Sequence, residues 1–235
     1  MSELIRVENL TKAYNHGPVL QGLSLTVQPG RIVGVMGPNG CGKTTLFKIL
    51  TGLINDYQGT VLIDGQAPGV YTKSIVSYLP EKTYLSDWMK AKDAIDMFHD
   101  FYADFDRNKA EEMLRQFRLE GKMRLKAMSK GMQEKLQLIL VMSRAAKLYI
   151  LDEPLSGIDP AARDTILDII LKNYSEEATV MLSTHLIYDV ERIFDDIIML
   201  SYGRLLVADS ADNIRSRSGM SLDAYFREAF KCSEN

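Results

Sequence analysis

The chain has 235 residues, of which 46% are hydrophobic and 25% charged, enough for one large core or a core with a smaller lobe. Its formal net charge of −3 gives no overall attraction to nucleic acid or to an anionic membrane surface, and we expect no nucleic-acid partner. Its two cysteines, Cys41 and Cys232, provide neither a disulfide framework nor a paired metal-binding spacing, so a reducing, cytosolic setting is expected.

Targeting and membrane segments are not indicated. No apolar run approaches the roughly 20 residues that a membrane-spanning helix needs, and residues 1–4 lack the basic and apolar regions of a signal peptide. We therefore expect a chain that is neither secreted nor membrane-spanning by itself.

The first quarter of the chain favours short strands separated by glycine, proline and asparagine turns. These strands are predicted at residues 4–7, 19–27, 32–36 and 60–64, with one helix at residues 44–50. From about residue 88 to 144 the apolar positions change to helical spacing, as in Ala94, Ile95 and Phe98. This middle third is predicted to be a helical lobe.

The segment between the strand at 32–36 and the helix at 44–50 matches the pattern G-x-x-x-x-G-K-[ST]. Its residues are Gly37, Pro38, Asn39, Gly40, Cys41, Gly42, Lys43, Thr44 and Thr45. Glycines let consecutive backbone N–H groups surround phosphate oxygens, and the following helix presents its positive dipole end to the same anion. Lys43 would reach the β- and γ-phosphates, and the Thr44 hydroxyl would ligate Mg²⁺. The segment predicts a nucleotide site, with kinase, GTPase and transporter all open.

Two more apolar strands, at residues 148–151 and 179–182, are each followed by a helix, which is the alternation of a parallel sheet covered on both faces. Asp152 and Glu153 follow the first of them, at the carboxyl edge where such sheets bind ligands. Asp152 is suited to hold Mg²⁺ through water, and Glu153 can polarise the attacking water. A general base of this kind contributes about 10²–10⁴-fold in rate. A hairpin at residues 196–200 and 204–207 and a short helical end complete the chain.

A further motif, Met128-Ser129-Lys130-Gly131-Met132-Gln133, precedes Asp152 and an apolar-periodic helix. With it, the chain resembles the ATP-binding subunit of an ATP-binding cassette (ABC) transporter along nearly its whole length. The resemblance implies that Ser129 and Gly131 contact the γ-phosphate of ATP held by a second subunit. Lys130 and Met132 depart from the family pattern of glycine and glutamine, and lysine lacks the backbone freedom of glycine.

The same resemblance assigns four more residues. Residues 155–159, ending in Asp159, resemble the D-loop that crosses the interface between two subunits. His185 resembles the switch histidine that contacts the γ-phosphate and positions the attacking water. Tyr14 resembles the aromatic that stacks on adenine, a contact worth roughly 1–3 kcal/mol. Glu81 stands in the Q-loop, where most members have glutamine, and would reach Mg²⁺; we expect it to make closure more dependent on that ion.

The segment after the Q-loop, residues 82–91, would line a groove that receives a short helix of a membrane subunit. Tyr84, Trp88 and Met89 lie in it, and tryptophan and methionine are enriched at interface centres. Helical-lobe core is the competing interpretation of these apolar residues.

The predicted fold class is α/β: a phosphate-loop NTPase core with a mostly parallel sheet, an N-terminal antiparallel β-subdomain and an inserted helical subdomain. Within one ABC ATPase domain over residues 1–235, we expect residues 1–81 and 146–208 to form the ATP-binding core. Residues 82–145 would form the helical signature lobe, and 209–235 a short helical tail.

The resemblance implies an ATPase that uses ATP and Mg²⁺, with Lys43, Glu153 and His185 as the catalytic residues. It would pair with a second ABC ATPase subunit, the same or a related chain, and with integral membrane transporter subunits. It would therefore lie in the cytoplasm, peripheral on the inner face of the cell membrane. The signature and Q-loop variants resemble bacterial export-type members that handle peptides, lipids or drug-like compounds.

Two other functions remain open. One is a non-transport ABC ATPase that remodels a soluble protein assembly, as in iron–sulfur assembly. The other is a plain phosphate-loop kinase or GTPase, which would need neither residues 129–132 nor Asp159. The absence of an Asn-Lys-x-Asp guanine-reading motif disfavours GTP.

Overall fold

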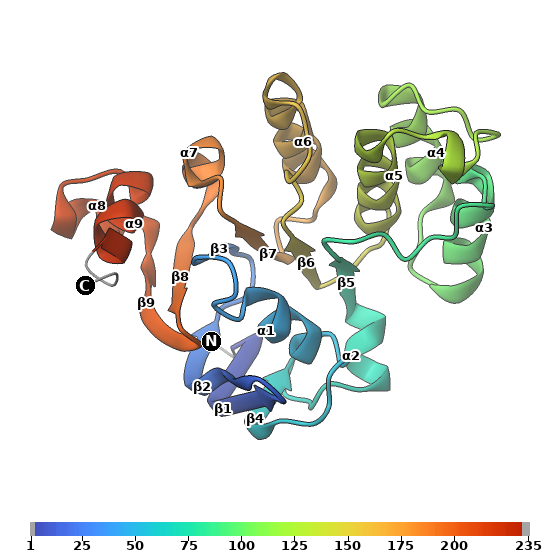
Figure 1. Cartoon of the computed structure of the whole chain (residues 1–235). Helices are drawn as coiled ribbons and strands as arrows, with labels where there is room; N and C mark the ends of the chain where they lie inside the picture. The colour runs from blue at the N-terminus through green and yellow to red at the C-terminus, as the bar shows by residue number, and fades with distance from the viewer. Residues whose placement is uncertain (1–2, 232–235) are drawn as a thin grey trace.

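A six-stranded sheet, parallel except at one edge, forms the centre of the protein (Figure 1). The computed structural model describes residues 3–231, apart from the side chains of Ala161 and Ala162. The strand order is β5-β6-β7-β3-β8-β9, and only β9 runs antiparallel to its neighbour. These strands are β3 (Ile32–Met36), β5 (Val76–Leu79), β6 (Leu148–Asp152), β7 (Thr179–Thr184), β8 (Asp196–Ser201) and β9 (Arg204–Ser210).

A second, antiparallel sheet has the order β2-β1-β4 and lies below the first in Figure 1. Its strands are β1 (Ile5–Tyr14), β2 (Gly17–Val27) and β4 (Gln58–Ile63), and the helix α1 (Lys43–Leu50) packs against both sheets. Together with the helices described below, this arrangement confirms the predicted α/β fold class with an antiparallel N-terminal sheet.

Alternation along the central strands divides the hydrophobic side chains between two cores, because successive side chains of a strand point to opposite faces. In β3, Val33 and Val35 join the core that contains α1, whereas Ile32 and Met36 join the core on the opposite face. The strands β6, β7 and β8 divide their side chains in the same way. The sheet is therefore buried on both faces, and its ligand-binding capacity lies at its edges.

Helices cover the second core and form the rest of the fold. They are α3 (Ala91–Phe101), α4 (Arg107–Gln116), α5 (Lys130–Met142), α6 (Pro160–Asn173), α7 (Ile187–Val190), α8 (Ala211–Ser218) and α9 (Leu222–Lys231), with 3₁₀ turns at Leu125–Ala127 and Glu191–Ile193. In Figure 1, α3, α4 and α5 form a group beside β5, as predicted for the middle third. Cys232 and the end of the predicted tail 209–235 lie outside the described residues.

Two short elements were absent from the sequence prediction: the helix α2 (Val70–Ile75) and the strand β5 that follows it directly. Each has six residues or fewer, which is too short for a hydrophobic period to distinguish helix from strand. Pairing with β6 fixes β5 as a strand, from Val76 opposite Leu148 to Leu79 opposite Leu151.

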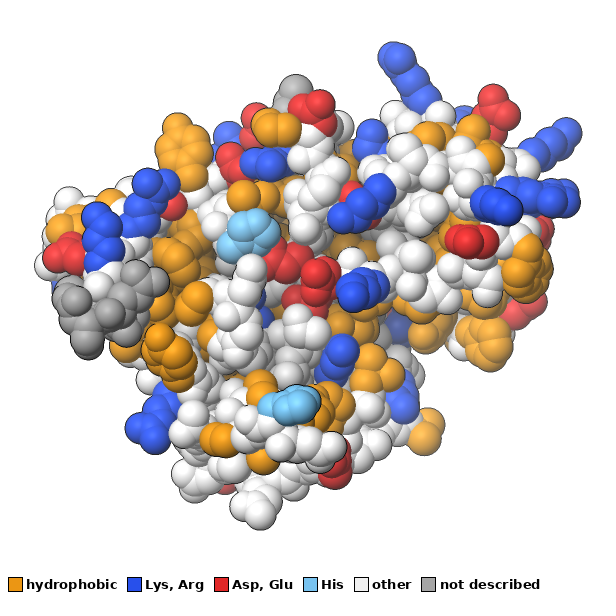
Figure 2. Space-filling view, viewed as in Figure 1, with side chains coloured by type: hydrophobic (Ala, Val, Ile, Leu, Met, Phe, Trp, Pro, Cys, Tyr) orange, Lys and Arg blue, Asp and Glu red, His pale blue; other side chains and the backbone are white. Residues whose placement is uncertain are grey.

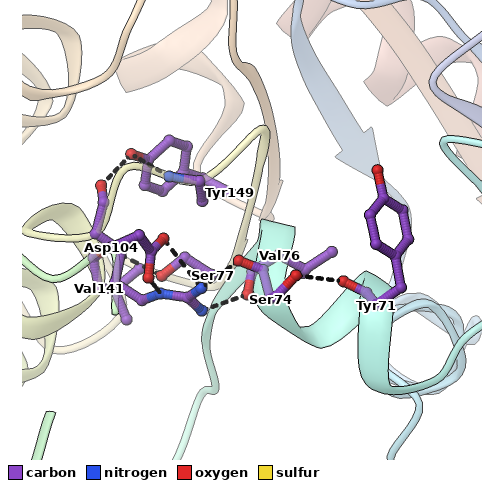
Figure 3. Close-up of polar contacts among 9 residues, drawn as sticks. Tyr71, Ser74, Val76, Ser77, Asp104, Val141 and Tyr149 are labelled. Carbon is purple, nitrogen blue, oxygen red and sulfur yellow. Dashed lines mark hydrogen bonds and ion pairs between the residues drawn. The ribbon is translucent and has the colours of Figure 1, made fainter. Parts of the chain in front are cut away.

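Arg144 connects the group of helices to the central sheet, in the region that Figure 3 shows. Its side chain is buried and donates from Nη1 to the Val76 carbonyl at 2.7 Å and from Nη2 to the Ser74 carbonyl at 2.7 Å. Nε and Nη2 also donate to the two carboxylate oxygens of Asp104, at 3.0 and 3.1 Å. The guanidinium lies 3.9 Å from the ring centroid of Tyr102. One residue thus joins the α2–β5 junction to the loop between α3 and α4.

Two hydroxyl groups strengthen this junction. Ser77 Oγ donates to the Val141 carbonyl at 2.9 Å, and Tyr149 Oη donates to the Arg144 carbonyl at 2.5 Å (Figure 3). Both hydroxyl groups belong to strands of the central sheet, and both carbonyls lie at the end of α5 or directly after it. The position of α5, and so of its first residues, depends on these contacts.

We predict that Arg144→Ala lowers the free energy of unfolding by about 3 kcal/mol, because it leaves two carbonyls and a carboxylate without their buried donor. Urea denaturation followed by circular dichroism measures this change. Arg107→Ala is the matched control, since Arg107 also forms ion pairs, with Asp96 and Glu111, but is 45% exposed. A loss from Arg144→Ala no larger than that from Arg107→Ala would contradict the assigned role.

Candidate active site

The carboxyl ends of three adjacent strands lie level at one edge of the central sheet. In the parallel register, Met36 of β3 pairs with Thr184 of β7, and Ser183 of β7 pairs with Asp152 of β6. The phosphate loop follows β3, His185 follows β7 and Glu153 follows β6, so these three segments lie side by side. Figure 2 shows acidic side chains grouped beside a histidine near the centre of this face.

The phosphate loop curls around the side chain of Lys43. Its Nζ donates to the carbonyl of Gly37 at 2.7 Å and to that of Pro38 at 3.3 Å, and the residue is 7% exposed. Gly37 and Gly42 have φ values of 156° and 108°, and a Cβ at either would lie within 3.0 Å of neighbouring atoms. The loop therefore requires glycine at both positions for conformation and for space.

The amino end of α1 completes the phosphate loop. Gly42 caps this helix without a side-chain hydrogen bond, so its first N–H groups and its positive dipole end suit an anion. Thr44 and Thr45 are half-buried, and Pro38, Asn39 and Gly40 are exposed. Cys41 is buried, and burial raises the pKa of its thiol; it fills space below the loop.

Glu153 and His185 form a pair at this edge. His185 Nδ1 lies 2.8 Å from Glu153 Oε2, and the glutamate side chain is 11% exposed. The backbone of Glu153 has a φ of 51°, and its N–H donates to the carbonyl and to Oγ of Ser183, at 3.2 and 2.9 Å. Burial raises the pKa of Glu153, opposed by the charges of His185 and Lys43. A carboxylate of raised basicity beside a phosphate loop is suited to accept a proton.

Asp152 has one satisfied and one unsatisfied oxygen. Oδ1 accepts a hydrogen bond from Ser183 Oγ at 2.6 Å, whereas Oδ2 is buried and has no hydrogen-bond partner among the described residues. Burial raises the pKa of Asp152; Ser183 and Thr44 oppose the rise, the negative charge of Glu81 adds to it, and Lys43 opposes it. A buried carboxylate oxygen without a partner is costly unless a cation reaches it.

The residues present fit a magnesium ion. Within residues 3–231 no group of three or more histidine, cysteine, aspartate or glutamate side chains forms a metal cluster, but Mg²⁺ needs only one or two protein oxygens besides water and phosphates. The unpartnered oxygen of Asp152 and the neighbouring Thr44 hydroxyl would supply them. Glu81 acts on Asp152 through its charge and is exposed, so it can approach the same ion.

The other predicted site residues lie apart from this edge or at its margin. Tyr14 ends β1 and is 46% exposed, with Lys12 Nζ 4.8 Å from its ring centroid. Ser129 caps α5 by accepting a hydrogen bond from Met132 N at 3.3 Å, and a Cβ at Gly131 would meet nothing within 4 Å. In the described part of the chain, no hydrogen bond or ion pair joins Ser129 or Gly131 to the phosphate loop. Asp159 lies directly before α6.

The proposed groove for a membrane subunit needs one correction. Trp88 is 71% exposed and Tyr84 is 47% exposed, but Met89 is only 7% exposed and belongs to the core of the helical group. Its backbone carbonyl accepts a hydrogen bond from Leu125 N at 2.9 Å. Met89 therefore cannot line a groove, since it packs inward while Trp88 points outward.

Three residues of the site make contacts that the sequence did not predict. Ser183, at the end of β7, bridges Asp152 and the Glu153 backbone through its hydroxyl. Tyr78 has a buried hydroxyl that finds no hydrogen-bond partner among residues 3–231, and its pKa is raised by burial and by the charges of Asp152 and Glu81. Gly157, with a φ of 83°, brings the D-loop against α5, where a Cβ would lie 2.8 Å from a Glu134 oxygen. Two of them carried a sequence signal: Ser183 stands directly after the predicted strand 179–182, and Gly157 lies within the segment that resembles the D-loop.

Comparisons with known proteins agree with this geometry. The ABC transporter family model matches residues 20–156. The ABC-type transporter ATP-binding protein EcsA of Bacillus subtilis is 29% identical over 97% of this chain and 97% of its own length. The SkfA peptide export ATP-binding protein SkfE of Bacillus subtilis is 30% identical over 87% of this chain and 88% of its own. A solved structure of the ATP-binding subunit of an ABC transporter matches with a TM-score of 0.86 at 28% identity, covering 97% and 99% of the two chains.

The chain therefore belongs to the ABC transporter family, as an ATP-binding subunit. The predicted family and enzyme class are confirmed: members of this family hydrolyse ATP to power transport. The relatives are subunits of transporters, which implies membrane subunits as partners. Among residues 3–231, no helix has both the length and the apolar character that a membrane crossing requires.

We predict that Asp152→Asn stabilises the protein in the absence of nucleotide and metal by about 1–3 kcal/mol at neutral pH, because a neutral amide removes the cost of a buried, half-satisfied charge. The folded pKa is raised above the reference value of 3.8, so the folded state binds more protons than the unfolded state between these two values. The wild-type free energy of unfolding therefore falls as pH rises through this window, and the advantage of the variant grows.

Urea titrations in EDTA at several pH values measure this difference. Asp56→Asn is a control of opposite sign, since Asp56 is exposed and the ammonium of Lys12 lowers its pKa. Removing that carboxylate leaves the buried Lys12 unpaired and is expected to destabilise. An Asp152→Asn variant less stable than wild type at neutral pH would contradict the proposed cost.

Proposed function

We propose that the chain binds ATP with Mg²⁺ at the edge formed by β3, β7 and β6, and hydrolyses it to drive export through separate membrane subunits. The observation that carries this proposal is the Glu153–His185 pair, 2.8 Å apart, beside the phosphate loop and the unpartnered oxygen of Asp152. This arrangement supplies a base, a polar partner for the γ-phosphate and a cation position at one edge.

Each residue of that edge has a proposed task. Backbone N–H groups of residues 37–45 and the Lys43 ammonium hold the phosphates, once Lys43 exchanges its carbonyl partners at Gly37 and Pro38 for them. Glu153 accepts a proton from the attacking water, and His185 orients that water toward the γ-phosphate. Asp152, Thr44 and Glu81 would hold Mg²⁺, which supplies neutralisation of phosphate charge when bound. Tyr14 stacks on the adenine ring.

A second subunit completes the site in this proposal. Ser129 and Gly131 begin α5 and have no hydrogen bond to their own phosphate loop within the described residues. The amino end of α5 offers N–H groups and a positive dipole end, which suit the γ-phosphate held by a facing subunit. Asp159 would lie at the same interface. ATP binding then closes two subunits and hydrolysis opens them, and this cycle drives transport.

The membrane partner is inferred from the chemistry of the exposed surface, and the cargo from the names of relatives. The exposed ring of Trp88, four residues after the half-exposed Tyr84, offers an aromatic surface to a partner. The relative SkfE is named for peptide export, and we propose a peptide, lipid or drug-like compound as cargo. The chain would act from the cytoplasmic face of the membrane.

We predict that Glu153→Gln lowers ATP turnover at least 100-fold, because the amide cannot accept the proton of water, while ATP affinity stays within about threefold. Since hydrolysis no longer opens the clamp, the variant should form a dimer on addition of ATP and Mg²⁺. Phosphate release and size-exclusion chromatography with light scattering measure the two effects.

Glu177→Gln is the matched control, because Glu177 is exposed in the loop before β7 and should leave both measurements unchanged. Full turnover by Glu153→Gln would remove Glu153 from the proposed role of base. A variant that binds ATP but stays monomeric with ATP and Mg²⁺ would contradict the clamp.

A further inference from the structure

The D-loop leaves Glu153 through two successive turns that fix its course. Ser156 N donates to the Glu153 carbonyl at 3.0 Å, and Ile158 N donates to the Leu155 carbonyl at 3.2 Å. The side chains of Leu155 and Ile158 are 1% and 5% exposed and belong to the core. The position of Ile158 is therefore tied to that of Glu153 by hydrogen bonds and burial together.

Arg163, in the first turn of α6, joins this loop to α7. Its Nε donates to the Ile158 carbonyl at 3.4 Å, and its Nη1 donates to Asp189 Oδ2 at 2.6 Å. The two charged side chains are only 21% and 29% exposed. A short charge-assisted bond with limited access to water is stronger than an ordinary surface ion pair.

Asp189 leads back to the switch histidine within one turn. Asp189 N donates to the Leu186 carbonyl at 3.3 Å, and Leu186 N donates to Thr184 Oγ1 at 2.9 Å, so the chain on both sides of His185 is held. The ring of His185 is itself 49% exposed and has Glu153 as its recorded side-chain partner. An exposed side chain loses rotamer entropy when it is held in one orientation. The alignment of the His185 ring with Glu153 therefore depends on a backbone that is already in place.

These contacts form a closed ring through the catalytic pair. It runs from Glu153 through Ile158 to Arg163, across to Asp189, and back through His185 to Glu153. We propose that Arg163 is a positioning residue that holds His185 in register with Glu153 and couples the D-loop to this pair. The inference rests on the proposed roles of Glu153 and His185 in hydrolysis. A shift of the D-loop at the subunit interface would then change the alignment of the pair through Arg163.

The fold supplies a matched control across the same two segments. Arg192 Nη2 lies 2.7 Å from Asp164 Oδ1, which joins the 3₁₀ turn after α7 to α6, as the Arg163 pair joins α7 to α6. The control pair is 63% and 77% exposed, so water screens it more than the Arg163 pair. Neutralising it removes an ion pair between these segments without touching the ring.

The test compares Arg163→Ala and Asp189→Asn with Arg192→Ala and Asp164→Asn in the full chain. We expect the first two variants to lower kcat for ATP at least tenfold with KM within twofold, and the control variants to change kcat by less than twofold. Asp189→Asn preserves side-chain size and serves if Arg163→Ala does not fold. Thermal unfolding of all four variants verifies that each is folded at the assay temperature. Arg163→Lys, which keeps the charge facing Asp189, should recover part of the lost kcat.

Two readouts separate positioning from a general loss of stability. A loss confined to kcat, with KM unchanged, indicates that ATP still binds and that only the reacting groups are misaligned. Recovery by Arg163→Lys indicates that the charge facing Asp189 is what matters.

An unchanged kcat in both Arg163→Ala and Asp189→Asn, or equal losses in the control variants, would overturn the inference. So would a loss of kcat in Arg163→Ala that Arg163→Lys does not recover in part. The proposed function fails separately: in that case the wild-type chain would not turn over ATP, or Glu153→Gln would not associate on addition of ATP and Mg²⁺. A wild-type chain that passes both checks, with Arg163 variants that behave like the controls, would reject the role of Arg163 alone.

Discussion

The position of β7 between β6 and β3 is the constraint on which the rest of the site depends. Because the three strands are parallel and in register, their carboxyl ends place Glu153, His185 and the phosphate loop next to one another. Ser183 then holds the two acidic residues in position, since its hydroxyl donates to Asp152 and accepts from the backbone N–H of Glu153. A shift of one residue in this register would turn each side chain to the other face of the sheet.

The site carries an electrostatic cost that its ligands would offset. Asp152 and Glu153 are adjacent acids whose pKa values are both raised by burial, and Asp152 retains an oxygen without a partner. Lys43 is the buried cation of the same edge, and it bonds to carbonyls of the phosphate loop. ATP and Mg²⁺ would supply charges that match these groups. Active sites commonly lower the stability of the folded protein, because activity needs groups that are unfavourable without a ligand.

Much of this site could be predicted from the sequence because its residues stand at the ends of apolar strands. Asp152 ends such a strand, His185 directly follows one, and Lys43 follows one after the phosphate loop. Parallel strands bring their carboxyl ends to one edge. The contacts of Arg144 and Arg163 could not be predicted, since each joins segments far apart in the chain that no local pattern relates. The sequence left Met89 open between groove and core, because periodicity shows that a residue is apolar, but not which neighbour covers it.

The elements β5 and α2 were missed for a related reason. Pairing with β6 makes β5 a strand, and packing decides the structure of α2; a segment of six residues or fewer shows neither effect in its sequence. The signature segment poses a different problem. Ser129 caps its own helix, which any helix with a serine at this position can do, so its proposed contact with ATP depends on a second subunit.

Mixing two defective subunits tests most directly whether the site is shared between chains. Lys43→Ala removes the phosphate-loop ammonium, and Ser129→Arg obstructs the amino end of α5; each variant alone should hydrolyse ATP poorly. In a head-to-tail dimer of one copy of each, one site combines the intact loop of one chain with the intact signature of the other. We therefore expect the mixture to hydrolyse ATP well above either variant alone. A mixture no more active than its components, although both bind each other, would contradict a site completed by a second subunit.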